Sequence, residues 1–363
     1  MEKILQGNYG IARGAWEAGV KVACAYPGTP SSEILNAITA QYKDDIKTEW
    51  SPNEKVAVEV AIGASIAGAR AIAPMKHVGL NVASDPFMTL AYTGVKGGLV
   101  IVVCDDPYAH SSQNEQDSRN WARFAKVPML EPADSQECKE FTKIAFDLSE
   151  QFDTPVLLRS ETRVSHSFSP VKLEERKESV VPLGLDVKDS TKFTMVPVNV
   201  RVRRLFVEER MKKLADFADE FKYNLMEIND TQFGVITNGV SYNYTKEVFP
   251  NYSYLKLGMV WPLPKKLLAK FFKTVNPIFR LDSFDRWYGS LANVGDNDSH
   301  VSGVVNYKNP HTTPLESCEI KSLKARFFFE FRRRNLLSHR NIERYQTIYN
   351  DCRGSDTSVF ATS

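Results

Sequence analysis

The sequence predicts two α/β units, a doubly wound domain with a largely parallel sheet followed by a smaller unit of the same class. Two observations lead to this prediction. Short apolar runs alternate with segments of helical periodicity over the first 165 residues, as in chains that cross repeatedly from strand to helix. A shorter alternation of the same kind begins near residue 225. The length of 363 residues accommodates both units, at roughly 150 residues per domain.

The first unit contains six apolar runs with helix-like segments between them. Strands are predicted at 20–26, 46–50, 70–75, 97–104, 127–130 and 154–160, and helices at 31–42, 54–68, 86–94 and 134–151. Asp134 and Glu137 have the spacing of a capping box at the start of the last helix. Thr29 followed by Pro30 indicates an N-cap with proline at the first helical position.

The rest of the chain changes character twice. Residues 166–224 predict a charged, aperiodic linker over the surface that leads into a helix at about 205–222. The second unit is expected over 225–282, with strands at 233–239, 252–258 and 276–282 and helices at 241–249 and 264–273. Residues 283–363 sustain neither a strand nor a helix period, which predicts a tail of low order.

Composition excludes several classes of protein. The chain is 43% hydrophobic and 25% charged, as is typical of globular proteins. It has no uncharged apolar run near the ~18 residues of a membrane helix, and its first residues do not have the pattern of a signal peptide. We therefore expect a cytoplasmic protein without membrane contact.

The cysteines and the basic tail exclude further functions. Cysteines at 24, 104, 138, 318 and 352 are too scattered for a zinc knuckle or an iron–sulfur run, so no metal site is expected on this chain. Residues 321–345 carry eight Lys or Arg against two Glu but no recognisable nucleic-acid-binding module. The sequence GDND at 295–298 lacks the context of a metal–diphosphate motif. We expect reduced thiols and no nucleic-acid partner.

Polar loops follow four of the predicted strands. They are YPGTPSSE (26–33), SPNE (51–54), MKHVGLNVASDP (75–86) and DDPYAHSSQNEQDSR (105–119). Ligands of open α/β sheets bind beyond the carboxyl ends of the strands. The four loops therefore predict one shared crevice.

Three side chains in these loops are candidates for chemistry. Glu54 opens a helix rich in small residues that would let a ligand approach closely, although acids in a first helical turn are also favoured by the helix dipole. Lys76 and His77 could hold a carboxylate or move a proton, or they could be ordinary loop side chains in contact with solvent. The sequence His-Ser-Ser at 110–112 lacks a nucleophile elbow, so serine hydrolysis is not expected.

The same loops resemble the alpha subunit of indolepyruvate ferredoxin oxidoreductase, a thiamine-diphosphate-dependent 2-oxoacid:ferredoxin oxidoreductase. The resemblance rests on YPGTPSSE, EWSPNEKVAVEVAIGASIAGARA, MKHVGLNVASDPFMTLAYTGVKGGLVIVV, HSSQNEQDSR and TPVLLRSETRVSHS. It continues through FGVITNG and YLKLGMVWPLP and covers roughly residues 5–275. It implies a thiamine-diphosphate-binding-fold pyrimidine domain at 1–165 and a transketolase C-terminal-like domain at 225–282.

The resemblance also implies roles for individual residues. Glu54 matches the glutamate that contacts N1′ of the aminopyrimidine ring and favours the activated tautomer of the cofactor. Tyr26, Gly28 and Thr29 match the turn that approaches the cofactor. The residues expected on the substrate side, for binding the carboxylate or transferring a proton, are Lys76, His77, Asn114, Gln116 and Arg119.

The sequence departs from the family pattern in two places. Asp105 and Asp106 stand where related pyruvate-specific enzymes place an arginine, which favours a bulky arylpyruvate as substrate. The CPGCPH segment, the Mg²⁺-binding GD motif and the CxxCxxCxxxCP runs of the family are missing. Mg²⁺ and 4Fe-4S clusters are therefore expected on a partner chain, and this chain is expected to be truncated, frame-disrupted or part of a split subunit.

These observations predict a component of an enzyme that oxidatively decarboxylates an arylpyruvate to an acyl-CoA and passes electrons to ferredoxin. Its thiamine diphosphate site would be shared with a polypeptide that carries the diphosphate-binding and ferredoxin-like domains. A beta subunit, ferredoxin, the 2-oxoacid and CoA are further expected partners, in an oligomer. Two alternatives stay open: a branched-chain or pyruvate-type substrate, and a non-catalytic module that keeps the fold and binds a partner.

Overall fold

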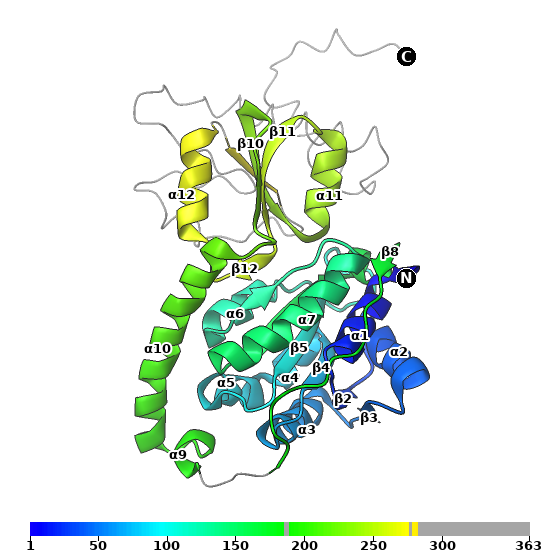
Figure 1. Cartoon of the computed structure of the whole chain (residues 1–363), viewed down its shortest axis with the longest axis vertical. Helices are drawn as coiled ribbons and strands as arrows, with labels where there is room; N and C mark the ends of the chain where they lie inside the picture. The colour runs from blue at the N-terminus through cyan, green and yellow to red at the C-terminus, as the bar shows by residue number, and fades with distance from the viewer. Residues whose placement is uncertain (185–188, 276–277, 282–363) are drawn as a thin grey trace.

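A computed structural model describes residues 1–184, 189–275 and 278–281. The basic stretch at 321–345, the GDND sequence and the predicted tail at 283–363 lie outside the described residues. Within those ranges the chain forms a larger N-terminal unit and a smaller unit above it in the view of Figure 1. No helix of the described part is both long and apolar enough to cross a membrane.

The N-terminal unit is built on a seven-stranded sheet in the order β12-β6-β7-β5-β4-β2-β3. The strands are β2 (Val22–Ala25), β3 (Lys47–Trp50), β4 (Ala71–Lys76), β5 (Leu99–Asp105), β6 (Met129–Leu130), β7 (Val156–Glu161) and β12 (Met259–Trp261). Neighbouring strands are parallel, apart from β12, which pairs antiparallel with β6. The six strands predicted in this unit are confirmed, and β12 joins them from a distant part of the chain.

Helices cover both faces of this sheet. On one face lie α1 (Gly7–Glu17), α2 (Ser32–Tyr42) and α7 (Ser135–Phe152), and on the other α3 (Glu54–Ile66), α4 (His77–Val82), α5 (Ser84–Thr93) and α6 (Arg119–Ala125). The central strand β5 serves both cores, because Leu99, Ile101 and Val103 enter one core and Val100 and Val102 the other. The doubly wound prediction is therefore confirmed.

The predicted helix starts are right in one place and wrong in another. Asp134 caps α7 by accepting a hydrogen bond from the Glu137 amide at 2.8 Å, while the Glu137 carboxylate accepts from the Ala133 amide at 2.9 Å. The prediction that Thr29 caps a helix beginning at Pro30 is wrong, because α2 begins at Ser32.

The turn before α2 is held by hydrogen bonds among its own residues, so the helix begins later than predicted. The amide and hydroxyl of Ser31 donate to the Gly28 carbonyl at 2.8 and 2.7 Å, and the Gly28 amide donates to the Ser32 hydroxyl at 2.8 Å. These bonds use the groups that would otherwise start a helix at Pro30.

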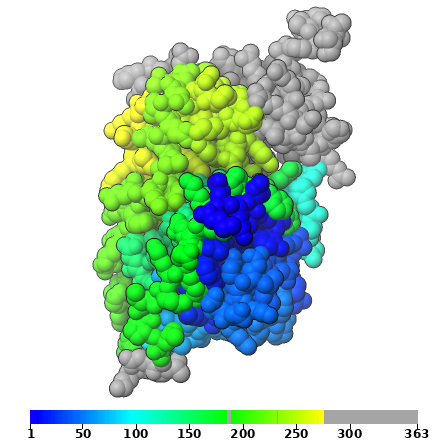
Figure 2. All heavy atoms as spheres, turned by 45° about the vertical axis from the view of Figure 1, so that its right-hand side comes forward, coloured from blue at the N-terminus to red at the C-terminus, as the bar shows by residue number. Residues whose placement is uncertain are grey.

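The segment after β7 was predicted as a linker, and part of it is a strand. After the short α8 (Thr162–His166), β8 (Phe168–Lys172) pairs antiparallel with β1 (Glu2–Gln6). Figure 2 shows the dark blue N-terminal residues at the surface beside this green segment. The sequence did not predict β1 and α1, the first two elements of the chain. β1 forms a strand because β8 supplies its hydrogen-bonding partner.

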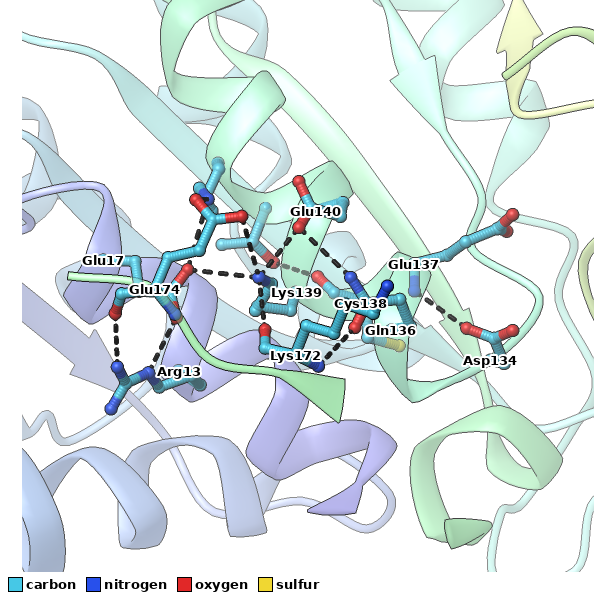
Figure 3. A network of polar contacts seen from close by, with 12 residues as sticks. Arg13, Glu17, Asp134, Gln136, Glu137, Cys138, Lys139, Glu140, Lys172 and Glu174 are labelled. Atoms are coloured by element: carbon cyan, nitrogen blue, oxygen red, sulfur yellow. Dashed lines mark hydrogen bonds and ion pairs between the residues drawn. The ribbon is translucent and has the colours of Figure 1, made fainter. Parts of the chain in front are cut away.

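Residues 173–184, here called the strap, then run over the surface as predicted. The Glu174 amide donates to Glu17 at 2.7 Å, the Lys177 amide to the Glu17 carbonyl at 2.8 Å, and the Gly184 amide to the Ala67 carbonyl at 2.8 Å. Figure 3 shows the ionic network beneath the strap, in which Glu17 lies between Arg13 and Lys139.

The strap leads to α9 (Ser190–Phe193) and the long helix α10 (Pro197–Glu220), which climbs along the first unit toward the second (Figure 1). The helix begins eight residues before the predicted start at 205, with proline in its first turn. Arg203 and Arg210 fasten it to carbonyls of Tyr92 and Ala91 on α5, at 2.7 and 2.8 Å.

The second unit has a four-stranded sheet in the order β13-β10-β11-β9. Its elements are β9 (Leu225–Glu227), β10 (Asp230–Asn238), α11 (Gly239–Val248), β11 (Tyr252–Leu257), α12 (Lys265–Thr274) and β13 (Ile278–Leu281). Three of these strands and both helices fall where the sequence predicts them. Asn238 and Asn243 contact the first unit, donating to Glu131 at 2.6 Å and to the Ala133 carbonyl at 2.8 Å.

Candidate active site

The four polar loops come together at one edge of the larger sheet. Strands β2, β3, β4 and β5 are parallel, so their carboxyl ends share that edge. A Cβ atom on Gly28 would lie 3.3 Å from the Lys76 Cβ, and one on Gly79 would lie 2.6 Å from the Glu54 Oε1. The loops after β2, β3 and β4 therefore touch one another.

Glu54 is nearly buried and has no partner. It is the first residue of α3, whose N-cap Asn53 accepts a hydrogen bond from the Val56 amide at 3.0 Å. The side chain is 8% exposed. Within the described residues its carboxylate makes neither a hydrogen bond nor an ion pair. A ligand donor would supply the partner that this little-exposed carboxylate lacks.

Lys76 and His77 lie where β4 passes into α4, and both point into the protein. Lys76 is 8% exposed and donates to the Ser111 carbonyl at 2.8 Å, with no carboxylate partner among the described residues. His77 is fully buried, and its Nε2 lies 3.1 Å from the Asn114 carbonyl. Because a carbonyl can only accept, Nε2 carries a proton, and the buried Nδ1 has no partner in the described region.

Both of these contacts are made by the loop between β5 and α6. Here loop 107–117 denotes its exposed part, which carries Asn114 and Gln116; the Gln116 amide donates to Asn114 at 2.9 Å. The structure thus brings four predicted residues together: Lys76, His77, Asn114 and Gln116. Tyr26 and Thr29 are exposed at the neighbouring turn.

Asp105 and Asp106 anchor the ends of this loop. Asp105 accepts from the amide and hydroxyl of Ser118 at 3.0 and 2.5 Å. Asp106 accepts from the Ser111 amide at 2.8 Å and from the hydroxyls of Ser112 and Thr162 at 2.6 and 2.8 Å. Both aspartates are fully buried, so they hold the loop and their position does not support the expectation that they select a bulky substrate.

Burial and hydrogen bonding act differently on these two acids. Burial raises the pKa of Asp105, even though the Arg159 guanidinium opposes the shift. Burial acts in the same sense on Asp106, but hydrogen bonds from Ser112, Ser111 and Thr162 outweigh it and hold that pKa below its ordinary value. Asp106 is therefore a stable anion at the base of loop 107–117.

Arg119, the fifth predicted substrate residue, pairs with a carboxylate at the end of loop 107–117. It is fully buried, and its Nε and Nη2 donate to Asp117 at 2.8 and 2.7 Å. This pairing, together with other polar contacts of the side chain, uses Arg119 to shape the start of α6. Its contacts with Asp117 tie the end of loop 107–117 to α6.

A buried charge junction lies beneath the loop, and the sequence did not predict it. Arg159 on β7 contacts Asp105 at 2.7 Å, Glu131 at 2.7 Å and Glu161 at 2.9 Å. Burial raises the pKa of Glu161 to about 8. Glu131 also binds Asn238 of the second unit. A single arginine within the apolar run TPVLLRS was the available signal.

The described residues contain no group of three or more His, Cys, Asp or Glu side chains placed to hold a metal ion. The cysteines of the described region, Cys24, Cys104 and Cys138, are buried and unpaired.

Comparison with solved structures identifies the fold. The chain superposes on 2-oxoglutarate:ferredoxin oxidoreductase from Magnetococcus marinus with a TM-score of 0.64 at 16% identity, over 80% of this chain and 59% of that one. A split-gene transketolase gives a TM-score of 0.51 at 12% identity over 79% and 83% of the two chains. These likenesses support the thiamine-diphosphate-binding fold class expected from the sequence.

Sequence comparison identifies the family. Indolepyruvate oxidoreductase subunits IorA of Archaeoglobus fulgidus and Methanothermobacter marburgensis are 42% and 45% identical over 78% and 77% of this chain. The 2-oxoglutarate synthase subunit KorA of Methanothermobacter thermautotrophicus is 27% identical over 48% of the chain. The chain spans about half the length of these relatives, 47%, 46% and 48% respectively.

A protein family described as "Pyruvate flavodoxin/ferredoxin oxidoreductase, thiamine diP-bdg" matches residues 13–195, which include Glu54, Lys76 and His77. The resemblance to the N-terminal part of the indolepyruvate ferredoxin oxidoreductase alpha subunit is thereby confirmed. The chain belongs to the pyruvate flavodoxin/ferredoxin oxidoreductase family, through its thiamine-diphosphate-binding domain.

Proposed function

We propose that this chain supplies the aminopyrimidine side of a thiamine diphosphate site in a 2-oxoacid:ferredoxin oxidoreductase that acts on an arylpyruvate such as indolepyruvate. The observation that carries the proposal is the Glu54 carboxylate, which is 8% exposed and has no partner among the described residues. Glu54 and its neighbours therefore fit a group that offers a ring nitrogen, as the aminopyrimidine does.

When bound, thiamine diphosphate supplies the electron sink for decarboxylation of a 2-oxoacid. Glu54 would hold a proton at N1′ of the aminopyrimidine, and burial against Gly79 keeps water from competing for that contact. Tyr26, Gly28 and Thr29 border the same edge from the neighbouring turn. These three residues would line the cofactor site and would not transfer protons.

Lys76 and His77 would act on the substrate. The Lys76 ammonium is nearly buried and faces only a neutral carbonyl, so an anionic ligand would stabilise it far more. His77 Nδ1 is buried and has no partner among the described residues, and in the neutral ring it would take a proton from CoA thiol or return one to product. Asn114 and Gln116 would contact the substrate from the loop.

The remaining parts of the site would come from another chain. The elements that carry the site also carry exposed apolar side chains: Tyr26 and Trp50 at the ends of β2 and β3, and Val60 and Val82 on α3 and α4. A contiguous apolar surface of such residues is typical of an interaction site. We infer that the partner carrying the diphosphate-binding and ferredoxin-like domains docks there and brings Mg²⁺ and 4Fe-4S clusters. A beta subunit and ferredoxin would complete the oligomer.

The test is reconstitution. The chain is co-expressed with a diphosphate-binding partner, and 2-oxoacid- and CoA-dependent reduction of viologen is measured. Glu54→Ala should abolish the activity. The matched control is Glu59→Ala on the same helix, where the side chain is about half exposed and lies near Lys55; it should leave the activity unchanged.

Three results would contradict the proposal. Activity that survives in Glu54→Ala would remove the glutamate from the site. Binding without activity in any combination would favour the non-catalytic module. A preference for branched-chain acids or pyruvate over arylpyruvates in a substrate panel would change the assigned substrate. Because the diphosphate half is expected elsewhere, calorimetry on this chain alone should detect no micromolar binding of thiamine diphosphate.

A further inference from the structure

Loop 107–117 closes over Lys76 and His77, the two side chains that the proposed function assigns to the substrate. Lys76 and His77 are 8% and 0% exposed. Their contacts with the loop are the bonds to the carbonyls of Ser111 and Asn114, at 2.8 and 3.1 Å. With Lys76 only 8% exposed, a substrate carboxylate has little access to its ammonium while the loop is closed and the Ser111 carbonyl accepts from one of the three N–H donors.

Two buried aspartates hold the loop, and its backbone is strained near its start. Asp105 binds Ser118 just after the loop, and Asp106 binds Ser111 and Ser112 in its middle. Tyr108 and Ala109 are two consecutive non-glycine residues with positive φ, at 73° and 48°. Side chains with a Cβ rarely adopt this conformation, so the closed form persists only while its contacts compensate for the strain.

The contacts of the closed form compete with a charged ligand. A neutral carbonyl accepts one hydrogen bond from Lys76, whereas a carboxylate would accept it and also neutralise the ammonium. A carboxylate therefore prefers the form in which Ser111 has left Lys76. Such a difference in affinity between two forms is what shifts a conformational equilibrium.

We propose that loop 107–117 is a lid that a substrate carboxylate opens by replacing the Ser111 carbonyl on Lys76. The proposal rests on the proposed function, because it takes the ligand to be a 2-oxoacid. Opening would keep Ser118 anchored to Asp105 and would turn Ser111 away from Lys76. The strain at Tyr108 and Ala109 is released as the loop leaves, which lowers the cost of opening.

Hydrogen–deuterium exchange on the full 363-residue chain tests the lid. Phenylpyruvate is the probe, and its methyl ester, which has no carboxylate, is the paired control. Phenylpyruvate should speed the exchange of the amides in loop 107–117 by about tenfold, the factor expected when a hydrogen bond to a charged group is lost. The methyl ester should leave the exchange unchanged.

Two variants show whether Lys76 is the contact that matters. Lys76→Met should speed loop exchange about tenfold without ligand, and phenylpyruvate should add nothing. Lys96→Met is the matched control, because Lys96 also donates to a backbone carbonyl, that of Gly184 at 2.8 Å, away from the loop. In Lys96→Met the loop should respond to phenylpyruvate as in the parent chain.

Several outcomes would overturn the lid. They are phenylpyruvate binding in calorimetry without faster loop exchange, an equal response to the ester, or no binding at all. None of these measurements requires the cofactor or a partner chain. If the loop opens but the reconstituted complex is inactive, the lid stands and the proposed function fails. An active complex whose loop does not respond gives the reverse result.

Discussion

The Glu54 side chain fills the space directly beside the Cα of Gly79. A Cβ atom built on Gly79 would lie 2.6, 2.7 and 2.8 Å from the Oε1, Cγ and Cδ atoms of Glu54. All three distances are shorter than any ordinary contact of a side chain. The absence of a side chain at Gly79, in the first turn of α4, therefore allows the Glu54 carboxylate to lie in this position.

Gly79→Ala should destabilise the chain through this one contact. Overpacking of a buried site costs about 1–3 kcal/mol in the free energy of unfolding. Glu54→Ala removes the three atoms nearest to the new methyl group, so the double variant should regain most of that loss. Denaturant titrations of the parent and the three variants measure the coupling.

Gly63→Ala on α3 is the control for this cycle. A Cβ atom there would meet nothing within 4 Å, and alanine is favoured over glycine in helices by up to about 1 kcal/mol. This variant should be slightly more stable than the parent. Additive losses from Gly79→Ala and Glu54→Ala would show that the two residues do not share the space.

Arg159 should be essential to the fold rather than to the chemistry. Arg159→Met leaves Asp105, Glu131 and Glu161 buried without their shared cation. Breaking a buried ion pair on one side costs about 3–5 kcal/mol, measured as the free energy of unfolding. The exposed pair Lys213–Glu209 is the contrast, since Lys213→Met should cause no measurable change. Equal effects of the two substitutions would rule out the junction as a stabilising element.

Glu161 should make stability depend on pH. Burial raises its pKa from 4.5 to about 8, against the opposing charge of Arg159. Between these values the folded state holds a proton that the unfolded state has released, so the free energy of unfolding falls as pH rises and levels off above about 8. The slope from one group is at most about 1.4 kcal/mol per pH unit.

Glu161→Gln, which mimics the protonated acid, isolates this contribution. The free energies of unfolding of the parent and the variant are compared between pH 5 and pH 9. The difference between them should widen as pH rises, with the variant the more stable at high pH. Parallel curves would mean that Glu161 does not bind a proton on folding.

Local pattern explains which parts of the fold could be predicted from the sequence. Buried parallel strands such as β5 are continuous apolar runs, and Asp134 marks the start of α7, so both were found. β1 and β8 escaped because neither is apolar and each becomes a strand only by pairing with the other across 160 residues of chain. β12 joins the first sheet from the second unit for a similar reason. Pairing between distant segments leaves no local pattern.

The candidate site divides in the same way. Glu54, Lys76 and His77 could be predicted because they follow strands whose carboxyl ends meet at one edge. The roles of Gly79, Asp106 and Arg159 depend on contacts between loops and strands far apart in sequence. Arg119 has a suitable residue type, but its burial beside Asp117 could not be foreseen from spacing.

Glu17 should control how tightly the strap lies on the first unit. Its carboxylate accepts from the Glu174 amide at 2.7 Å and pairs with Arg13 at 2.8 Å (Figure 3). Glu17→Ala removes both contacts, so the strap should open more often. Trypsin, which cleaves after Arg176 and Lys177 within the strap, should then cut the native chain faster by about tenfold, the effect of losing one charged hydrogen bond.

Two further variants make this prediction specific. Glu175→Ala changes an exposed strap residue that has no contact of this kind, so cleavage should proceed at the parent rate. Gly19→Ala acts on the strap from the opposite side. Gly19 has a φ of +74°, and a Cβ atom there would lie 2.3 Å from the Lys177 carbonyl oxygen, so this variant should accelerate cleavage as Glu17→Ala does. If Glu17→Ala and Glu175→Ala were cut equally fast, the Glu17 carboxylate would not hold the strap, and its other contacts, which include the pairing of Glu174 with Lys143 at 2.6 Å, would be sufficient.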